Sequence, residues 1–351
     1  MLMLHQYEIT IVGGGPAGMF AAFYAGMRGA DVLLVESTAA LGGQPATQYP
    51  QKMIYDIAGI DGVNGVALTQ RLAQQMDHFQ PEIRLDTRVD SINPATGTDL
   101  VVDWLQVDAN TPAAKANPHG YILQTNQGSI ATQTVLIATG GGAFAPRRLA
   151  VDYPTEWDGQ RVIYTVRDVA ALTGQTLAIA GGGDSAIDWA LTLVDRAQDV
   201  HLIHRRQQFR GLESSVAQLK QSRVHIHTPF VIDGLSLTAN DQLAVDLRPV
   251  HGDEHEHLVV DRLLVNYGFA SDNKQLRRWE LALDHNLVTV DRLYQTSRPG
   301  IFAIGDVVTY PGKVKLIANA FGEAPIAVDA ALRTIHPDLR QPPHSAAVIG
   351  K

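Results

Sequence analysis

Two glycine-rich segments have the residue types and spacing that can cradle a pyrophosphate. A G-x-G-x-x-G pattern begins at Gly13, and a G-x-G-x-x-A pattern begins 168 positions later, at Gly181. In such a turn the first glycine permits a tight bend, the second lets the backbone approach phosphate oxygens, and the third position keeps a helix close to a strand. Backbone N–H groups at the start of the helix then face the phosphate charge. The candidate phosphate-binding residues are Gly13, Gly15, Ala17 and Gly18 in the first segment and Gly181, Gly183 and Ser185 in the second.

The residue that closes each unit predicts which nucleotide it binds. Glu36 ends the second apolar run of the first segment; a carboxylate there accepts hydrogen bonds from ribose hydroxyls and repels a 2′-phosphate, which suits FAD. The same offset of 168 leads to His204, followed by Arg205, Arg206 and Arg210. Guanidinium groups pair bidentately with phosphate oxygens, so we interpret this group as a clamp for the 2′-phosphate of NADPH. A solvated basic face is the alternative, and the position of the group after the second strand favours the clamp.

Both segments need the same supporting elements. Residues 7–37 and 175–206 each have the pattern of an apolar strand, a glycine turn, an amphipathic helix and a second apolar strand. A β-meander with a long polar loop near residues 108–119 is expected between them, and a second meander after them. The stretch "TSRPGIFAIGDVV" predicts a strand that ends at Gly305 and Asp306, before a helix.

This order predicts an α/β protein with two Rossmann-like nucleotide-binding domains of three-layer ββα type, one inserted in the other. Residues 1–145 and 271–351 would form the FAD-binding domain, and residues 146–270 the NADP(H)-binding domain. The junctions "GGAFAPRR" and "NYGFASDN" contain the glycine and proline residues expected of linkers.

Composition narrows the chemistry further. The chain has 351 residues and a net charge of -8, which argues against nucleic-acid and membrane partners. Its first residues lack the pattern of a signal peptide, so we expect a cytoplasmic protein. It contains no cysteine, so any redox chemistry must belong to a bound cofactor. No metal site is predicted: the "HGDEHEH" stretch, residues 251–257, is interpreted as a solvated hairpin loop, and His225 and His227 as partly buried or surface residues on one face of a strand.

Taken together, the glycine turn, the "ATG" return, the inserted "HRRQQFR" segment and the "GD" near the end resemble the low-molecular-weight thioredoxin reductase superfamily. The Cys-x-x-Cys of thioredoxin reductase is absent. The chain is more similar to the thioredoxin-reductase-like ferredoxin/flavodoxin–NADP(+) oxidoreductases. The matching stretches include "LGGQPATQYPQKMIYDIAG", "GGGDSAIDWAL", "GDVVTYPGKVKLIANAFGEAPIAV" and "PPHSA".

The resemblance implies further FAD contacts. Gln44 would help to hold the flavin, Tyr49 would stack on one face of its ring, and Asp306 would bind the ribityl chain. Val89 and Phe144 occupy positions that line the FAD in this family. His344 occupies the position that covers the other face of the flavin from the partner subunit of a homodimer, and Ser345 would lie beside the ring.

The implied activity is electron transfer between NADPH and ferredoxin or flavodoxin, with a hydride passing to flavin N5 and single electrons leaving; no catalytic side chain is identified. An acidic ferredoxin needs a local basic surface, for which Arg147, Arg148, Lys313 and Lys315 are candidates. An NADPH-dependent flavin reductase or oxidase with a small acceptor, and a non-catalytic redox sensor that binds FAD and NADPH, are the alternatives. The pattern does not distinguish ferredoxin from flavodoxin, the direction of electron flow, the docking surface or the rotation of the domains.

Overall fold

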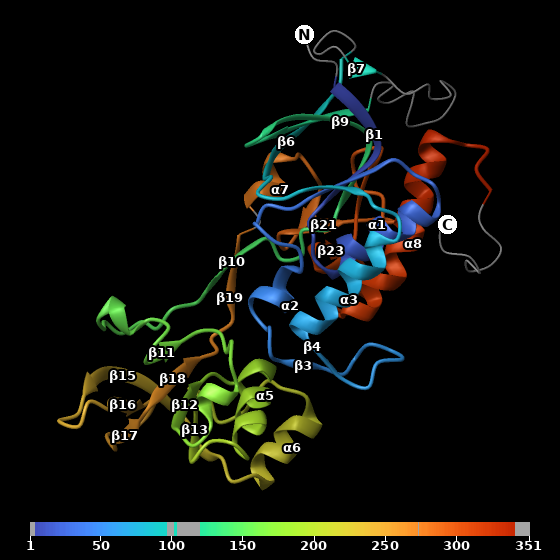
Figure 1. The fold of residues 1–351 in the computed structure, drawn as a ribbon. Helices are drawn as coiled ribbons and strands as arrows, with labels where there is room; N and C mark the ends of the chain where they lie inside the picture. The colour runs from blue at the N-terminus through green and yellow to red at the C-terminus, as the bar shows by residue number, and fades with distance from the viewer. Residues whose placement is uncertain (1–3, 97–101, 104–119, 273, 341–351) are drawn as a thin grey trace. The chain divides into compact units, whose positions relative to one another are not determined.

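The computed structural model describes residues 4–96, 102–103, 120–272 and 274–340 (Figure 1). The chain divides into two compact units. The first comprises Met1–Thr47, Met53–Ala143 and Ser271–Lys351, and the second comprises Gln48–Lys52 and Phe144–Ala270. Each unit is built on its own sheet. The expected polar loop at residues 108–119 lies outside the described residues.

The sheet of the first unit has parallel strands at its centre, in the order β5-β2-β1-β9-β8-β6, with β22 paired to β9 and β7 paired to β1. Strands β6 and β8 form an antiparallel meander with β9. The strands are β1 (Leu4–Val12), β2 (Val32–Val35), β5 (Glu82–Arg84), β6 (Val89–Pro94), β7 (Val102–Asp103), β8 (Tyr121–Thr125), β9 (Gly128–Ile137) and β22 (Ile301–Ala303).

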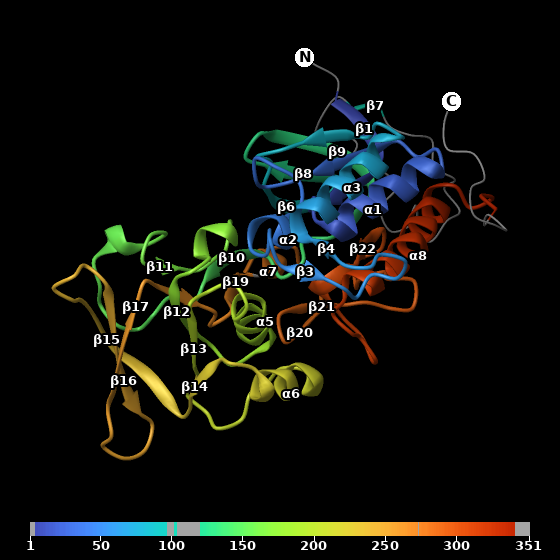
Figure 2. The same ribbon diagram turned by 60° about the horizontal axis from the view of Figure 1, so that its bottom comes forward.

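Helices cover one face of this sheet, and α1 lies beside both α3 and α8 (Figures 1 and 2). The helices of the unit are α1 (Pro16–Met27), α2 (Gly43–Thr47), α3 (Gly65–Asp77), α7 (Lys274–Arg278), the 3₁₀ turn η3 (Gly305–Val307) and α8 (Ile317–Ile335). Local signals fix where they begin: Pro16 suits the first position of α1, and the Asn64 side chain caps α3 by accepting from Ala67 N at 2.8 Å.

The sheet has an apolar core on each face, as a three-layer domain requires. Ile9 and Ile11 of β1 pack with the helices, whereas Val12 and Leu33 belong to the second core, with Trp279.

The remaining short strands of the first unit are β3 (Met53–Ile54), β4 (Val63–Asn64), β20 (Leu283–Asp284), β21 (Leu287–Thr289) and β23 (Val308–Thr309).

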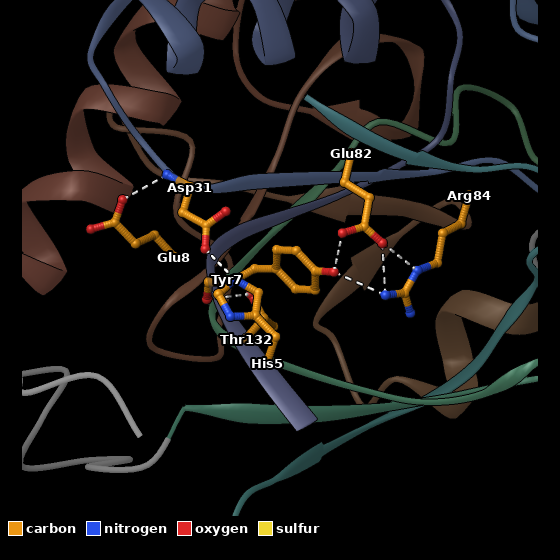
Figure 3. Close-up of polar contacts among 7 residues, drawn as sticks. All are labelled: His5, Tyr7, Glu8, Asp31, Glu82, Arg84 and Thr132. Atoms are coloured by element: carbon orange, nitrogen blue, oxygen red, sulfur yellow. Dashed lines mark hydrogen bonds and ion pairs between the residues drawn. The ribbon is translucent and has the colours of Figure 1, made fainter. Parts of the chain in front are cut away.

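A polar cluster ties the first strand to the edge strand β5 (Figure 3). The phenol of Tyr7 donates to Glu82 Oε2 at 2.5 Å and accepts from Arg84 Nη2 at 2.9 Å. Burial, and then the hydrogen bond to Glu82, raise the pKa of Tyr7. Burial alone would raise the pKa of Glu82, but hydrogen bonds from Tyr7 and Arg84 outweigh it, so this pKa is lowered. The cluster contains none of the predicted nucleotide-binding residues, and its role is to stabilise the sheet.

The second unit has a five-stranded parallel sheet in the order β11-β18-β12-β13-β14. Helices α5 and α6 cover one face, and an antiparallel meander of β15, β16 and β17 covers the other (Figure 2). The parallel strands are β11 (Val162–Ile163), β12 (Thr176–Ala180), β13 (Asp199–Ile203), β14 (His225–His227) and β18 (Arg262–Val265). The meander and the helices are β15 (Phe230–Leu237), β16 (Leu243–Pro249), β17 (Glu256–Val260), α5 (Asp184–Leu193), α6 (Glu213–Gln221) and the 3₁₀ turns η1 (Thr155–Trp157) and η2 (Ala170–Leu172).

Two of the places where the chain passes between the units pair with each other as a two-stranded sheet of β10 (Ala143–Pro146) and β19 (Phe269–Asp272). The predicted fold class, two Rossmann-like three-layer units with one inserted in the other, is confirmed. No helix in the described part of the chain is long and apolar enough to cross a bilayer.

Candidate functional site

The first glycine-rich turn joins β1 to α1 and leaves no room for side chains at two of its glycines. Gly13 has a φ of +116°, and a Cβ there would lie 2.5 Å from the carbonyl oxygen of Ala138. A Cβ at Gly18 would lie 1.8 Å from the carbonyl oxygen of Gly13, so only glycine lets α1 approach the strand this closely. In this described stretch the N-cap, Gly15, provides no side-chain cap, and the first turn has no acidic residue. The N–H groups at the start of α1 are therefore open to an anion.

Glu36 lies beside this turn, and its carboxylate has four protein donors within reach. It is 8% exposed, and its Oε2 accepts from Gly14 N at 2.7 Å. Its Oε1 accepts from Thr38 N at 2.9 Å and from the hydroxyls of Ser37 and Thr38 at 3.1 and 3.0 Å. A carboxylate has about four acceptor positions. Two of the four donors are hydroxyls that can rotate away, so ribose hydroxyls could replace them while the two backbone bonds hold the carboxylate in place.

The other predicted FAD residues of the first unit lie in different elements. The side-chain nitrogen of Gln44, in α2, would be 3.6 Å from a Cβ at Gly140, in the turn that follows β9. Asp306 is half-buried in η3, directly after β22. Val89 is 1% exposed, and its side chain belongs to the second apolar core; its carbonyl accepts a hydrogen bond from the Gln275 side chain.

The remaining predicted flavin contacts lie in other segments of the chain. Tyr49 is half-buried and lies in the segment Gln48–Lys52, which is part of the second unit. Phe144 lies in β10. His344 and Ser345 lie outside the described residues.

Sequence reasoning missed one buried charge next to Asp306. Glu323 of α8 is 1% exposed and accepts from Gly305 N at 2.6 Å. A charged residue on the buried face of the apolar helix "IANAFGEAPIAV" is the signal that could have identified it, because an ionised carboxylate is rarely buried without partners.

The second glycine-rich turn repeats the first in its backbone bonds. Gly13 N donates to Val35 O at 2.8 Å, and Gly181 N donates to Ile203 O at 3.0 Å. The elements of the two units match at an offset of 168 residues. β12 ends 168 residues after β1, β13 ends 168 residues after β2, and α5 begins 168 residues after α1. The inferred internal repeat is therefore a structural repeat. Gly183 is the N-cap of α5, and Ser185 is half-buried in the first turn of that helix.

His204 occupies the position of Glu36 but plays a different part. Its ring covers the second turn so closely that a Cβ at Gly182 would lie 2.2 Å from ring atoms. Its Nε2 donates to Gln208 O at 3.2 Å, and Phe209 stacks on it with ring centroids 5.3 Å apart. Burial lowers the pKa of His204, and the neighbouring arginines lower it further against the opposing hydrogen bond to Gln208. The neutral ring thus holds the loop that carries the arginines.

This loop is pinned at its far end as well. Arg210 N donates to Gly182 O at 2.8 Å, as Gly42 N does to Gly14 O at 2.9 Å in the first unit. The side chains of Arg205, Arg206 and Arg210 are exposed, and none of them forms an ion pair with another residue that the structure describes. Three exposed guanidinium groups on one short loop can bind a phosphate dianion.

A group of histidines lies on the neighbouring strands. His227 Nδ1 pairs with Glu256 Oε2 at 2.5 Å, and His227 Nε2 lies 3.0 Å from His201 Nδ1. His225 stacks on His201 with ring centroids 4.9 Å apart. Burial, and then the nearby His227 and His225, lower the pKa of His201. Within the described ranges, no group of three or more histidine, aspartate or glutamate side chains is arranged to hold a metal ion. Residues 251–255 form an exposed loop between β16 and β17.

Of the four basic residues considered for docking, one is buried and another is already paired. Lys313 is buried and forms an ion pair with Glu323, so the expectation that it is a surface charge was wrong. Arg148 pairs with Asp158 at 2.5 Å. Arg147 and Lys315 are exposed.

Comparison with known proteins identifies a family. The family model for pyridine nucleotide-disulphide oxidoreductases matches residues 7–324. A protein of Latilactobacillus sakei subsp. sakei (strain 23K) named ferredoxin–NADP reductase 2 is 50% identical over 345 residues, which cover 98% of each chain. A protein of Lacticaseibacillus paracasei named ferredoxin–NADP reductase is 49% identical over 346 residues, again with 98% of each chain covered.

Solved structures show the same fold at lower identity. The thioredoxin reductase of T. acidophilum has a TM-score of 0.74 and 22% identity over 95% of this chain and 98% of its own. The thioredoxin reductase of Lactococcus lactis in its FR conformation has a TM-score of 0.74 and 24% identity, covering 95% of this chain and 100% of its own.

Proposed function

Because the chain belongs to the pyridine nucleotide-disulphide oxidoreductase family, we propose that it is a ferredoxin–NADP reductase that uses bound FAD. Relatives of 41 to 50% identity that carry this name, over nearly their whole length, support the proposal. The disulphide chemistry in the family name needs cysteine, and this chain has none. The single observation that carries the proposal is the pair of glycine turns with equivalent backbone bonds, one followed by a buried carboxylate and the other by a loop with three exposed arginines.

The residues of the first unit fit FAD. The turn around Gly13 and Gly18 is closed to any Cβ and open to an anion, and the Glu36 carboxylate has two hydroxyl donors that can yield to ribose. We propose that this turn holds the pyrophosphate, with Ala17 beside it, and that Gln44 and Asp306 hold the flavin end. When bound, FAD supplies the chemistry that the chain lacks, since it accepts two electrons together and releases them one at a time.

The second unit would bind NADPH. The turn at Gly181 and Gly183, with Ser185, would face the pyrophosphate, while the arginine clamp would take the 2′-phosphate. His204 would act from beneath the clamp, because its neutral ring fixes the loop rather than contributing charge.

The finer assignments extend the resemblance. We propose a homodimer in which His344 and Ser345 of one subunit cover the flavin of the other, and Tyr49 and Phe144 as further flavin contacts, with the backbone around Val89 lining the cofactor. Flavodoxin is the second acceptor to test. A cytoplasmic location is proposed because NADPH is a cytoplasmic reductant. The paired strands β10 and β19 would be the hinge if the two units rotate during turnover.

The experiment measures steady-state reduction of cytochrome c by the FAD-loaded protein, with NADPH or NADH, and with ferredoxin, flavodoxin or neither. A rate that requires ferredoxin and prefers NADPH is expected. A rate that ferredoxin does not change would replace the proposal with a general NADPH-dependent flavin reductase. A flavin that stays oxidised under excess NADPH without oxygen would leave a non-catalytic sensor.

A further inference from the structure

The buried carboxylate of Glu323 has three protein donors, which come from two segments that precede its helix. Its Oε2 accepts from the backbone N–H of Gly305 at 2.6 Å. Its Oε1 accepts from the Tyr310 hydroxyl at 2.7 Å and from Lys313 Nζ, with which it forms an ion pair. The side chains of Lys313 and Glu323 are 5% and 2% exposed. One side chain of α8 therefore contacts the connection that follows β22 at three residues.

Gly305 is the start of the turn that presents Asp306. It has a φ of +78°, and a Cβ there would lie 3.3 Å from the Ala17 Cβ and 3.9 Å from the Ala320 Cβ. The turn is thus wedged between the first turn of α1, which belongs to the glycine cradle, and the first turns of α8. A small displacement of Gly305 would move Asp306 relative to that cradle.

The site is built for an anion on α8. Burial, and then the hydrogen bond to Glu323, raise the pKa of Tyr310, so the phenol stays protonated and can only donate to this carboxylate. The Lys313 ammonium balances the charge. All three groups are donors, so both oxygens of the residue at position 323 must accept. A glutamine would present one amide group that cannot accept.

We propose that Glu323 is a positioning residue for FAD: by holding the Gly305 N–H, it fixes Asp306 at the distance from the α1 turn that the ribityl chain requires. The inference rests on the proposed function, since it needs FAD in the first unit. Lys313 and Tyr310 serve the same purpose by holding the carboxylate in place through the ion pair and the Tyr310 hydrogen bond.

The test uses three variants of the full-length protein and measures the FAD dissociation constant by titrating apoprotein with FAD and following the quenching of flavin fluorescence. Glu323→Leu with Lys313→Met removes the ion pair and the acceptor for Gly305. Glu323→Gln with Lys313→Met removes the same charges but keeps one amide oxygen for Gly305. We expect at least a tenfold weaker affinity in the leucine variant and an affinity within threefold of wild type in the glutamine variant.

The third variant, Glu323→Gln alone, serves if the leucine variant does not fold. Its Lys313 ammonium competes with the Gly305 N–H for the single amide oxygen, so FAD binding should weaken at least threefold, and adding Lys313→Met should restore it. Asp329→Asn is the control. Asp329 is another buried carboxylate of α8 and pairs with Arg28 and Arg333, so this change should lower thermal stability without changing FAD affinity more than twofold.

A double-mutant cycle separates positioning from general stability. If Glu323 acts through Asp306, the difference in FAD affinity between the leucine and glutamine variants should disappear in an Asp306→Ala background, whereas a merely structural effect would persist. Persistence of the difference, or equal affinities of the two variants in the wild-type background, would overturn the inference. Wild-type protein that binds no FAD would overturn the proposed function, and this inference with it.

Discussion

Replacement of Arg206 by glutamine should separate NADPH from NADH. Arg206 is exposed and lies in a loop that is fixed at both ends, by His204 Nε2 bound to Gln208 O and by Arg210 N bound to Gly182 O. The change therefore removes a guanidinium while leaving the loop in place. NADH has no 2′-phosphate, so its affinity should not depend on this guanidinium.

The size of the effect follows from the contacts that are available. A hydrogen bond to a charged group is worth about 1.5–3 kcal/mol, and the exposure of the site places the expected loss near the lower end of that range. With about 1.4 kcal/mol per factor of ten, the dissociation constant for NADPH should rise roughly ten- to thirtyfold. The dissociation constant for NADH should change less than twofold.

The assay measures the affinity of the FAD-loaded protein for each nucleotide by the change in flavin absorbance. Arg248→Gln is the matched control, because Arg248 is an exposed arginine of the same unit that is already paired, with Asp233 at 2.9 Å. That control should leave both affinities unchanged. Equal losses for NADPH and NADH in Arg206→Gln, or no loss for NADPH, would refute the assignment of the clamp.

Three further outcomes are expected. Gly18→Ala should abolish or strongly weaken FAD binding in a titration of apoprotein, because its Cβ would lie 1.8 Å from the carbonyl oxygen of Gly13; unchanged binding would contradict the closed cradle. The unfolding temperature should fall as the pH drops below about 6.5, because burial lowers the pKa of His201 and only the unfolded chain then takes up the proton. The unfolding temperature of His201→Gln should depend less on pH. Equal pH dependence in this variant and the wild type would contradict the prediction. Tyr7→Phe should cost about 1 kcal/mol of stability through the lost bond to Glu82, measured by denaturant unfolding, with FAD affinity retained.

The sequence predicted the parts of the site that depend on local pattern. The offset of 168 residues placed both turns, because glycine spacing and apolar runs determine a strand-turn-helix-strand unit without help from distant residues. The difference between Glu36 and the arginines could be identified for the same reason, since each follows directly from the end of a strand.

Features that depend on distant contacts were not predicted. Lys313 lies in the glycine-containing segment "YPGKVKL", which is typical of an exposed loop. Its side chain is nevertheless buried, because it forms an ion pair with the buried Glu323. Ten residues separate the two, and they share no helix face, so no periodicity links them. The pairing of Tyr7 with Glu82 spans 75 residues and likewise follows only from the order β5-β2-β1 of the sheet.

The two turns share one backbone arrangement but differ in the residues that follow their second strands. Their strand-to-turn bonds are similar, at 2.8 and 3.0 Å. The side chains after the second strand differ in charge. The Glu36 carboxylate accepts a hydrogen bond from Gly14 N–H. The neutral His204 ring instead lies over Gly182, and the charged groups of the second unit are the arginines further along the loop. If the arginines bind the 2′-phosphate as proposed, specificity for NADPH would depend on how the loop from His204 to Arg210 is held.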